Sequence, residues 1–382
     1  MTTYNSPAMH KVIHSERLRQ ALQARGWTQK TLATELGVTA QAVTNWIKGD
    51  DFPRPDKLLK LATTLKLGFA DLVDSRKANR PIIAFRKKGA AKTTDEHVLK
   101  ATAMGSLLKP LVPFLPVFKS LRVQAPSPSI EYNALQATAS EVRDRIGLGA
   151  EAALPYEHLI EQFRNNAAVI VPVLWGEKKN HKNALHILLP EEQITFIFLN
   201  LDTRIEDFKF WMAHELAHVY TPDLAGTDEG EDFADALAGA LLFPRAIASA
   251  AYAKAIKHES AHGQISELQA YAEEHEISLF TVFQQVNGYA KASGLDLLSC
   301  RELEIHKIRN SQRGKLVSEM LFEPIPAEPV AYIAASQNVF RSEFFPALQR
   351  MIKSGGPGAG YVQQVMDISH RDAVELYVEL SK

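Results

Sequence analysis

Two histidines four residues apart, His214 and His218, enclose Glu215 within an otherwise apolar run of the chain. On an α-helix, residues i and i+4 lie one turn apart on the same face, so both imidazoles can point at one ion. Glu215 then stands beside the ion, where its carboxylate can reach a water molecule without crowding the metal. This H-E-x-x-H arrangement predicts a zinc-dependent hydrolase in which Glu215 is the catalytic base.

A carboxylate pair with the same helical spacing follows, Glu231 and Asp235. Glu231 is placed to be the third ligand, because two histidines and one glutamate leave the open position that a catalytic zinc needs. Asp235, one turn on, can accept the free N–H of a ligand histidine and fix its tautomer. The plainer interpretation of these residues is a solvated polar helix face. We predict a Zn²⁺ site made by His214, His218 and Glu231.

The five-residue pattern occurs a second time, from His258 to His262. Its surroundings are different, because Gly263 follows it directly and glycine is a poor residue for a helix interior. The next carboxylates, Glu267 and Glu273, have no partner at the spacing of Glu231 and Asp235. We therefore predict that the second copy holds no metal.

The surroundings of the first copy resemble a known family. His-Glu-Leu-Ala-His at 214–218, then Glu231, Ala234 and Asp235, and finally Leu-Leu-Phe-Pro at 241–244 are similar to the ImmA/IrrE zinc metallopeptidases. The resemblance covers residues 132–288, and members often have asparagine where this chain has Asp235. It implies a thermolysin-like active site on a small, mostly helical domain. It also implies that the substrate is a DNA-binding repressor.

Residues 15–67 have the pattern of successive short helices. Thr28 is a good N-cap for the second of them. Small Ala33 allows two helices to cross closely, Gly37 permits a tight turn, and Val43 and Trp46 can pack the next helix back against the first two. This spacing predicts a helix-turn-helix unit.

The stretch from Thr28 to Gly49 resembles the lambda-repressor-like (Xre) family, which places its third helix in the major groove of DNA. The resemblance implies six contact residues, of which the first three face base edges and the last three approach phosphates: Gln41, Thr44, Asn45, Gln29, Lys30 and Lys48. The alternative is a helical bundle used only for protein contacts. Xre-like domains often bind two half-sites as dimers, so the resemblance also suggests a homodimer.

Charge is distributed unevenly along the chain. Residues 1–90 contain 16 lysines and arginines against 7 aspartates and glutamates, whereas the whole chain has 43 against 44. A basic N-terminal part on an acidic remainder suggests that this part meets a polyanion, which favours DNA over a protein contact.

The single cysteine, Cys300, excludes an internal disulfide. Without an apolar N-terminal leader or a stretch long enough to span a membrane, we expect a cytoplasmic protein without a membrane partner.

The expected fold class is mostly α (α+β), in four regions. These are a helix-turn-helix domain at 10–76, a basic and proline-rich connector at 77–131, a peptidase domain at 132–290, and a mixed region of unknown role at 291–382. The domain boundary is placed among the five prolines between residues 110 and 128, which indicate an extended connector.

Three strands are expected in the peptidase domain, at 169–173, 184–188 and 194–199, and residues 81–85 form a further possible strand. An edge strand beside the metal helix could hold an extended peptide by main-chain hydrogen bonds. His186 is interpreted as a packed or surface histidine and not as a ligand, because nothing pairs with it at ligand spacing. Tyr220 could stabilise an oxyanion, but an ordinary half-buried tyrosine is the plainer interpretation.

Together these features predict a DNA-binding zinc endopeptidase. Its substrate would be a repressor or the product of an adjacent gene, in a stress, mobile-element or defence context. The alternative is an Xre-type transcriptional regulator or antitoxin whose zinc domain binds a partner without cutting it. A third hypothesis, a purely structural zinc, is disfavoured by the open coordination position.

Overall fold

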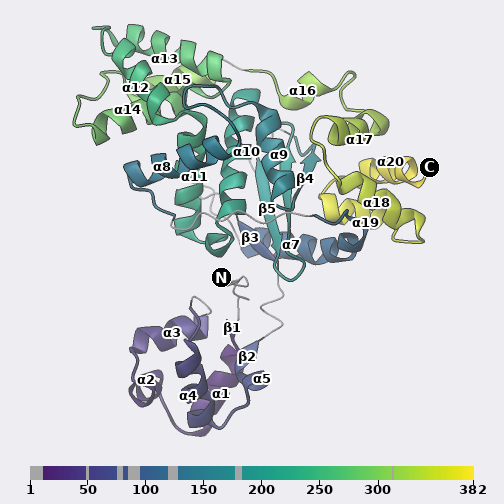
Figure 1. Cartoon of the computed structure of the whole chain (residues 1–382). Helices are drawn as coiled ribbons and strands as arrows, with labels where there is room; N and C mark the ends of the chain where they lie inside the picture. The colour runs from purple at the N-terminus through teal and green to yellow at the C-terminus, as the bar shows by residue number, and fades with distance from the viewer. Residues whose placement is uncertain are drawn as a thin grey trace. The chain divides into compact units, whose positions relative to one another are not determined.

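The computed structural model describes residues 12–48, 51–74, 81–84, 95–118, 128–176, 183–311 and 314–382 (Figure 1). The chain divides into two compact units, which meet in the sequence between residues 80 and 81. Each unit has a hydrophobic core of its own.

The first unit is a helix-turn-helix bundle. Its elements are β1 (Val12–Ile13), α1 (Ser15–Ala24), α2 (Gln29–Leu36), α3 (Ala40–Lys48), α4 (Pro55–Leu65), α5 (Phe69–Leu72) and β2 (Val73–Asp74). The Thr28 side chain caps α2 by accepting a hydrogen bond from the Thr31 amide, and Gly37 ends α2 in the left-handed conformation with a φ of 65°. Ala33, Val43 and Trp46 are buried in one core, so the predicted helix-turn-helix unit is confirmed.

The second unit is built around a four-stranded sheet. Its strands are β3 (Ile82–Ala84), β4 (Ala168–Val173), β5 (Ala184–Leu189) and β6 (Ile194–Asn200), in the order β3-β5-β6-β4. β4 and β6 are parallel, and β5 is antiparallel to both of its neighbours. The three strands predicted between residues 169 and 199 are confirmed. The possible strand at 81–85 is found at 82–84, and residue 85 lies outside the described residues. β3 therefore forms one edge of the sheet, beside β5, and β4 forms the other.

Helices cover both faces of the sheet (Figure 1). Successive side chains of a strand point to opposite faces, and two neighbours on β5 show which helix lies on which side. His186 points toward α10 (Ile205–Tyr220), where its ring nitrogen Nδ1 lies 3.5 Å from Glu215 Oε2. Ile187 points toward α7 (Asp95–Leu108), where it lies against Gly105. The helices α10 and α7 are therefore on opposite faces of β5.

The remaining helices of residues 109–292 complete this arrangement. They are η1 (Lys109–Phe114), α8 (Tyr132–Arg145), α9 (Tyr156–Asn165), η2 (Pro222–Leu224), α11 (Asp228–Leu242), α12 (Arg245–Ala255), α13 (Ala261–His275) and α14 (Leu279–Ala292). Among the described residues, no single helix is long and apolar enough to cross a membrane. Only α11 and α12 taken together, bent by 70° between them, would reach such a length.

The predicted connector at 77–131 is wrong for residues 95–118. These residues form α7 and η1, and Met104, Leu108 and Leu111 are buried in the core of the second unit. Pro110 lies in the first turn of η1, where proline's missing N–H has no helical partner to lose. The prolines predict an extended chain, but Leu111 and Leu115 between them are buried. The domain boundary accordingly lies near residue 80.

The C-terminal residues are helical and belong to the second unit, so the predicted boundary at 291 is also wrong. Their helices are α15 (Glu302–Ser311), α16 (Val317–Leu321), α17 (Pro329–Asn338), α18 (Phe344–Lys353), α19 (Ala359–Met366) and α20 (His370–Ser381). The Tyr332 hydroxyl donates a hydrogen bond to the carbonyl of Pro172 on β4. Fully buried Phe344 and Phe345 join the core that contains the sheet. The second unit is therefore not complete without these helices.

Candidate metal centre and active site

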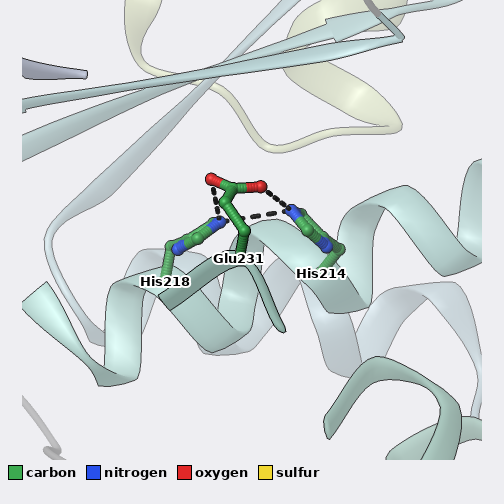
Figure 2. Close-up of side chains that lie close together, drawn as sticks. All are labelled: His214, His218 and Glu231. Carbon is green, nitrogen blue, oxygen red and sulfur yellow. Dashed lines mark hydrogen bonds and ion pairs between the residues drawn. The ribbon is translucent and has the colours of Figure 1, made fainter. Parts of the chain in front are cut away.

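Two helices in contact, α10 and α11, present the residues that the sequence singled out (Figure 2). α11 begins where Thr227 accepts a hydrogen bond from the Gly230 amide at 3.0 Å. A side chain at Gly230 would collide with the carbonyl oxygen of Leu224, because its Cβ would stand 2.1 Å from that atom. Glycine at this position therefore allows the first turn of α11 to lie close to η2, and the next residue of that turn is Glu231.

His214, His218 and Glu231 converge on one point. Each offers one ligand atom, and these atoms all lie within 4.8 Å of one another. The two imidazole Nε2 atoms are 3.2 Å apart, and the carboxylate oxygens of Glu231 lie 3.6 Å from His214 Nε2 and 3.3 Å from His218 Nε2. Figure 2 shows the histidines rising from one helix and the glutamate from the next. In the part of the chain that the structure describes, this is the one group with such spacing.

The donor set fits a metal ion. All three side chains are buried, with exposures of 1%, 1% and 6%. Neither carboxylate oxygen of Glu231 has a hydrogen-bond partner among the described residues; both face the imidazoles alone. Buried charged groups are normally paired, hydrogen-bonded or bound to a metal. Two imidazole nitrogens and one carboxylate directed at a common point are the ligands that a divalent ion such as zinc takes in a catalytic site.

The charges around this point are strongly coupled. Burial opposes the ionised form of Glu231, but the two facing imidazoles outweigh burial and lower the pKa of its carboxyl group to about 2. Burial also opposes a charged His214, yet the carboxylates of Asp235 and Glu231 raise its pKa to about 9. For His218, burial dominates and lowers the pKa of the imidazole. The carboxylates therefore favour the positively charged form of His214, whereas burial favours the neutral form of His218.

Asp235 lies one helical turn beyond Glu231, on the outer side of His214. Its Oδ1 atom is 3.0 Å from His214 Nδ1. A carboxylate at this nitrogen keeps the proton on Nδ1 and leaves Nε2 directed at the centre. The structure thus brings together His214, His218, Glu231 and Asp235, the four residues that the spacing selected.

Glu215 lies beside the ligand group, and His186 lies beside Glu215. The Glu215 side chain is only 4% exposed, and the His186 ring is 5.6 Å from the ring of His218, measured between centroids. His186 is a packed histidine, and it is buried against the Glu215 carboxylate. The signal in the sequence was a single polar residue within the apolar strand 184–189, because a buried polar group needs a partner. Tyr220 is a packed residue, and its hydroxyl donates to Gln162 Oε1 at 3.1 Å.

Comparison with known families gives two matches. Residues 18–72 match the sequence model of the helix-turn-helix family. Residues 171–283, which contain the converging ligands, match that of the IrrE N-terminal-like domain. The chain joins a helix-turn-helix domain to an IrrE N-terminal-like domain. This confirms the architecture that the motifs suggested.

Other comparisons add little to these matches. No curated protein matches the sequence. A search of solved structures gave a ComR from Streptococcus suis at 10% identity, covering 96% of this chain and 93% of that one, with a TM-score of 0.14. A score this low gives no information about the fold.

The second H-E-x-x-H copy lies inside the IrrE N-terminal-like domain but makes no comparable centre. Ser260 is the N-cap of α13, and its side chain accepts a hydrogen bond from the Gly263 amide. The pattern therefore crosses the start of a helix, and His258 and His262 do not lie one turn apart on it. The His258 side chain is 46% exposed and has Glu267 at 3.9 Å.

The residues expected to contact DNA lie on α2 and α3 of the helix-turn-helix domain. Thr44 donates a hydrogen bond to Gln29 across the two helices at 3.0 Å, and Gln41 donates to Asn45 along α3 at 2.8 Å. Lys30 and Lys48 are exposed. Apart from the partly buried Thr44 and Asn45, the side chains of this group are open to solvent. The group therefore forms one accessible polar surface across the helix-turn-helix.

Proposed function

We propose that the chain is a DNA-binding zinc endopeptidase. The observation that carries this proposal is the buried convergence of His214, His218 and Glu231 with Glu215 one residue away on the same helix. A structural zinc site would have four protein ligands, whereas three protein ligands leave a position for chemistry. The match of residues 171–283 to the IrrE N-terminal-like domain supports the same function.

Zinc held by these three ligands would polarise the carbonyl of the scissile peptide bond and lower the pKa of a water molecule. Glu215 takes the proton from the attacking water and passes it to the nitrogen of the leaving amine. Asp235 keeps the Nε2 atom of His214 directed at the centre through its contact with Nδ1. His186 borders the Glu215 carboxylate from β5, so it restricts where that carboxylate can point.

The proposed substrate is a regulatory protein, in particular a repressor or the product of a neighbouring gene. We test this by incubating the zinc-loaded full chain with repressors encoded beside its gene and identifying fragments by mass spectrometry. A single specific cut is expected. Stable complexes without any cut would instead favour the alternative, a regulator or antitoxin whose zinc domain binds a partner without proteolysis.

The affinity for zinc is expected to rise with pH up to about 9. Zinc binds a neutral imidazole. The carboxylates beside His214 outweigh the effect of burial and raise the pKa of its imidazole to about 9, so they favour the protonated, charged form below that pH. Binding below that pH displaces this proton, so the apparent affinity falls about tenfold for each pH unit below 9. Glu231, with a pKa of about 2, adds no dependence in this range.

Competition with a chromophoric chelator between pH 6.5 and 9.5 measures this dependence. Asp235→Asn is the matched variant, because it lacks the charge that raises the pKa of His214. Its affinity should therefore level off at a lower pH. An affinity independent of pH between 7 and 9 in the wild type would show that His214 is already neutral.

We further propose that the polar surface of α2 and α3 reads DNA. Gln41→Ala and Asn45→Ala should each weaken binding to a selected operator by about 1–3 kcal/mol and leave binding to random DNA unchanged. Lys30→Ala should weaken both and reduce the salt dependence by about one unit of slope, because it removes one phosphate contact. Fluorescence anisotropy on an operator selected from random sequences measures these effects, with Lys60→Ala on α4 as control. Equal losses on operator and random DNA would rule out base reading by Gln41 and Asn45.

A further inference from the structure

The edge of the sheet nearest the candidate active site is occupied by the chain's own strand β3. β3 pairs antiparallel with β5, and in this register Ala84 stands opposite His186. Side chains opposite one another in an antiparallel pair lie on the same face, with their Cβ atoms about 4.5–5.5 Å apart. The His186 ring in turn borders Glu215 and His218. Only one cross-strand pair therefore separates β3 from the catalytic carboxylate.

Two glycines make room for this strand. A Cβ at Gly105 of α7 would stand 2.4 Å from Cβ of Pro81, the residue that leads into β3. A Cβ at Gly226, in the loop between η2 and α11, would stand 2.7 Å from the carbonyl oxygen of Ile83. Such approaches are closer than carbon atoms allow, so each site accepts β3 only because it carries no side chain.

The hold on β3 is nevertheless limited. The strand has three residues; Ala84 is buried, but the larger side chains of Ile82 and Ile83 are only partly buried. It also begins directly after the boundary between the two units. A segment attached in this way competes with free peptides at an effective concentration on the millimolar scale. It can thus occupy a weak peptide site without binding tightly.

We propose that β5 is the substrate-binding strand of the proposed peptidase and that β3 is its internal occupant. The ligand of this site is an extended polypeptide that pairs antiparallel with β5. It carries a small residue opposite His186, as Ala84 does, and apolar residues at the two preceding positions. A protein substrate must displace β3 to reach Glu215. This inference rests on the proposed function, because only a peptidase would use the peptide as a substrate, but it is tested by peptide binding alone.

Gly105→Ala is the variant that separates β3 from β5. It changes neither strand, and alanine favours the helix α7 by up to about 1 kcal/mol over glycine, so α7 is retained. Its Cβ would stand 2.4 Å from Cβ of Pro81 and 3.0 Å from Cγ2 of Ile187 on β5. The closer contact forces Pro81 and the strand that follows it to move, whereas Ile187 has to shift by only a few tenths of an ångström. Gly288→Ala is the matched control, a glycine in α14 whose Cβ would meet only Tyr132 at an ordinary 3.9 Å. Both are made in the full chain carrying Glu215→Gln, so that a bound peptide is not cut.

The probe is a fluorescein-labelled peptide with the sequence of residues 79–85, and anisotropy measures its binding. We expect at least about tenfold tighter binding to the Gly105→Ala protein than to its parent, no gain with Gly288→Ala, and no binding of a peptide N-methylated at its three strand positions. Hydrogen exchange at residues 82–84 reports whether β3 has been released. Released β3 without any gain in peptide binding would overturn the proposal.

Two further outcomes are decided by the same assay. Gly105→Ala could leave β3 protected from hydrogen exchange. In that case Ile83→Asp is used, because it releases the strand by placing a charge against the core. Peptide binding to that variant then tests the proposal. The assay also separates this inference from the proposed function. If the variant binds the peptide but the wild type cuts no protein, the peptide site on β5 is supported and the peptidase function is contradicted. If the wild type cuts a repressor but the peptide does not bind after β3 is released, the peptidase function is supported and the peptide site on β5 is contradicted.

Discussion

Glu215→Gln is expected to slow proteolysis by about 10²–10⁴-fold and to leave zinc bound. Glutamine has nearly the same size and shape as glutamate, so the neighbouring ligands His214 and His218 stay in place. An amide cannot take a proton from water, and loss of a general base costs about 10²–10⁴-fold in rate. The 4% exposure of Glu215 leaves little access for a substitute base from solvent. Cleavage rates and bound zinc, both measured on the same protein sample, test the two halves of this expectation.

Glu229→Gln provides the matched control, because Glu229 is an exposed carboxylate at the start of α11. It should change neither zinc nor rate. A Glu215→Gln protein that cuts as fast as the wild type would exclude the proposed mechanism. If instead neither the wild type nor Glu215→Gln cuts a substrate, and both still regulate transcription, the regulator or antitoxin alternative gains support.

Glu231→Ala is expected to remove zinc from the protein. Losing an outer partner of a metal ligand already costs about 10–100-fold in affinity, and a direct ligand should cost more. The substitution also leaves His214 and His218 facing each other, 3.2 Å apart, without the carboxylate between them. Zinc per chain, measured by elemental analysis after gel filtration, should fall from about one to near zero.

The matched control removes the other H-E-x-x-H copy. A His258→Ala/His262→Ala protein should keep its zinc, because His258 is exposed and the pattern crosses the start of α13. Loss of zinc from this double variant, or its retention in Glu231→Ala, would contradict the assigned site. A wild-type protein that takes up no zinc even after reconstitution would favour the alternative, a regulator that binds its partner without cutting it.

Local periodicity was enough to predict that His214, His218 and Glu231 converge. Residues i and i+4 on a helix must share a face, so His214 with His218, and Glu231 with Asp235, could be paired from spacing alone. The strands at 168–200 were also predictable, because short apolar runs bounded by polar residues leave few alternatives.

Contacts between distant segments were not predictable in the same way. Whether His186 reaches Glu215 depends on the register of β5 and on which face lies against α10. The placement of β3 beside β5 depends on room left by Gly105, which no periodicity reveals. The predicted connector is wrong for a related reason, since proline indicates where a helix cannot continue but not whether the residues around it are buried.

The separate cores of the two units also bear on how such a chain can change during evolution. Recombination near residue 80 would leave both cores whole, so one DNA-reading unit can be exchanged for another. The same event near residue 290 would divide a single core, because Phe344 and Phe345 pack in the one that holds the sheet. Operator preference can therefore be inherited independently of the peptidase-like unit, whereas the C-terminal helices must be inherited with it. Any such exchange must also keep residues 81–84, since the segment that fills the edge of the sheet begins directly after the junction.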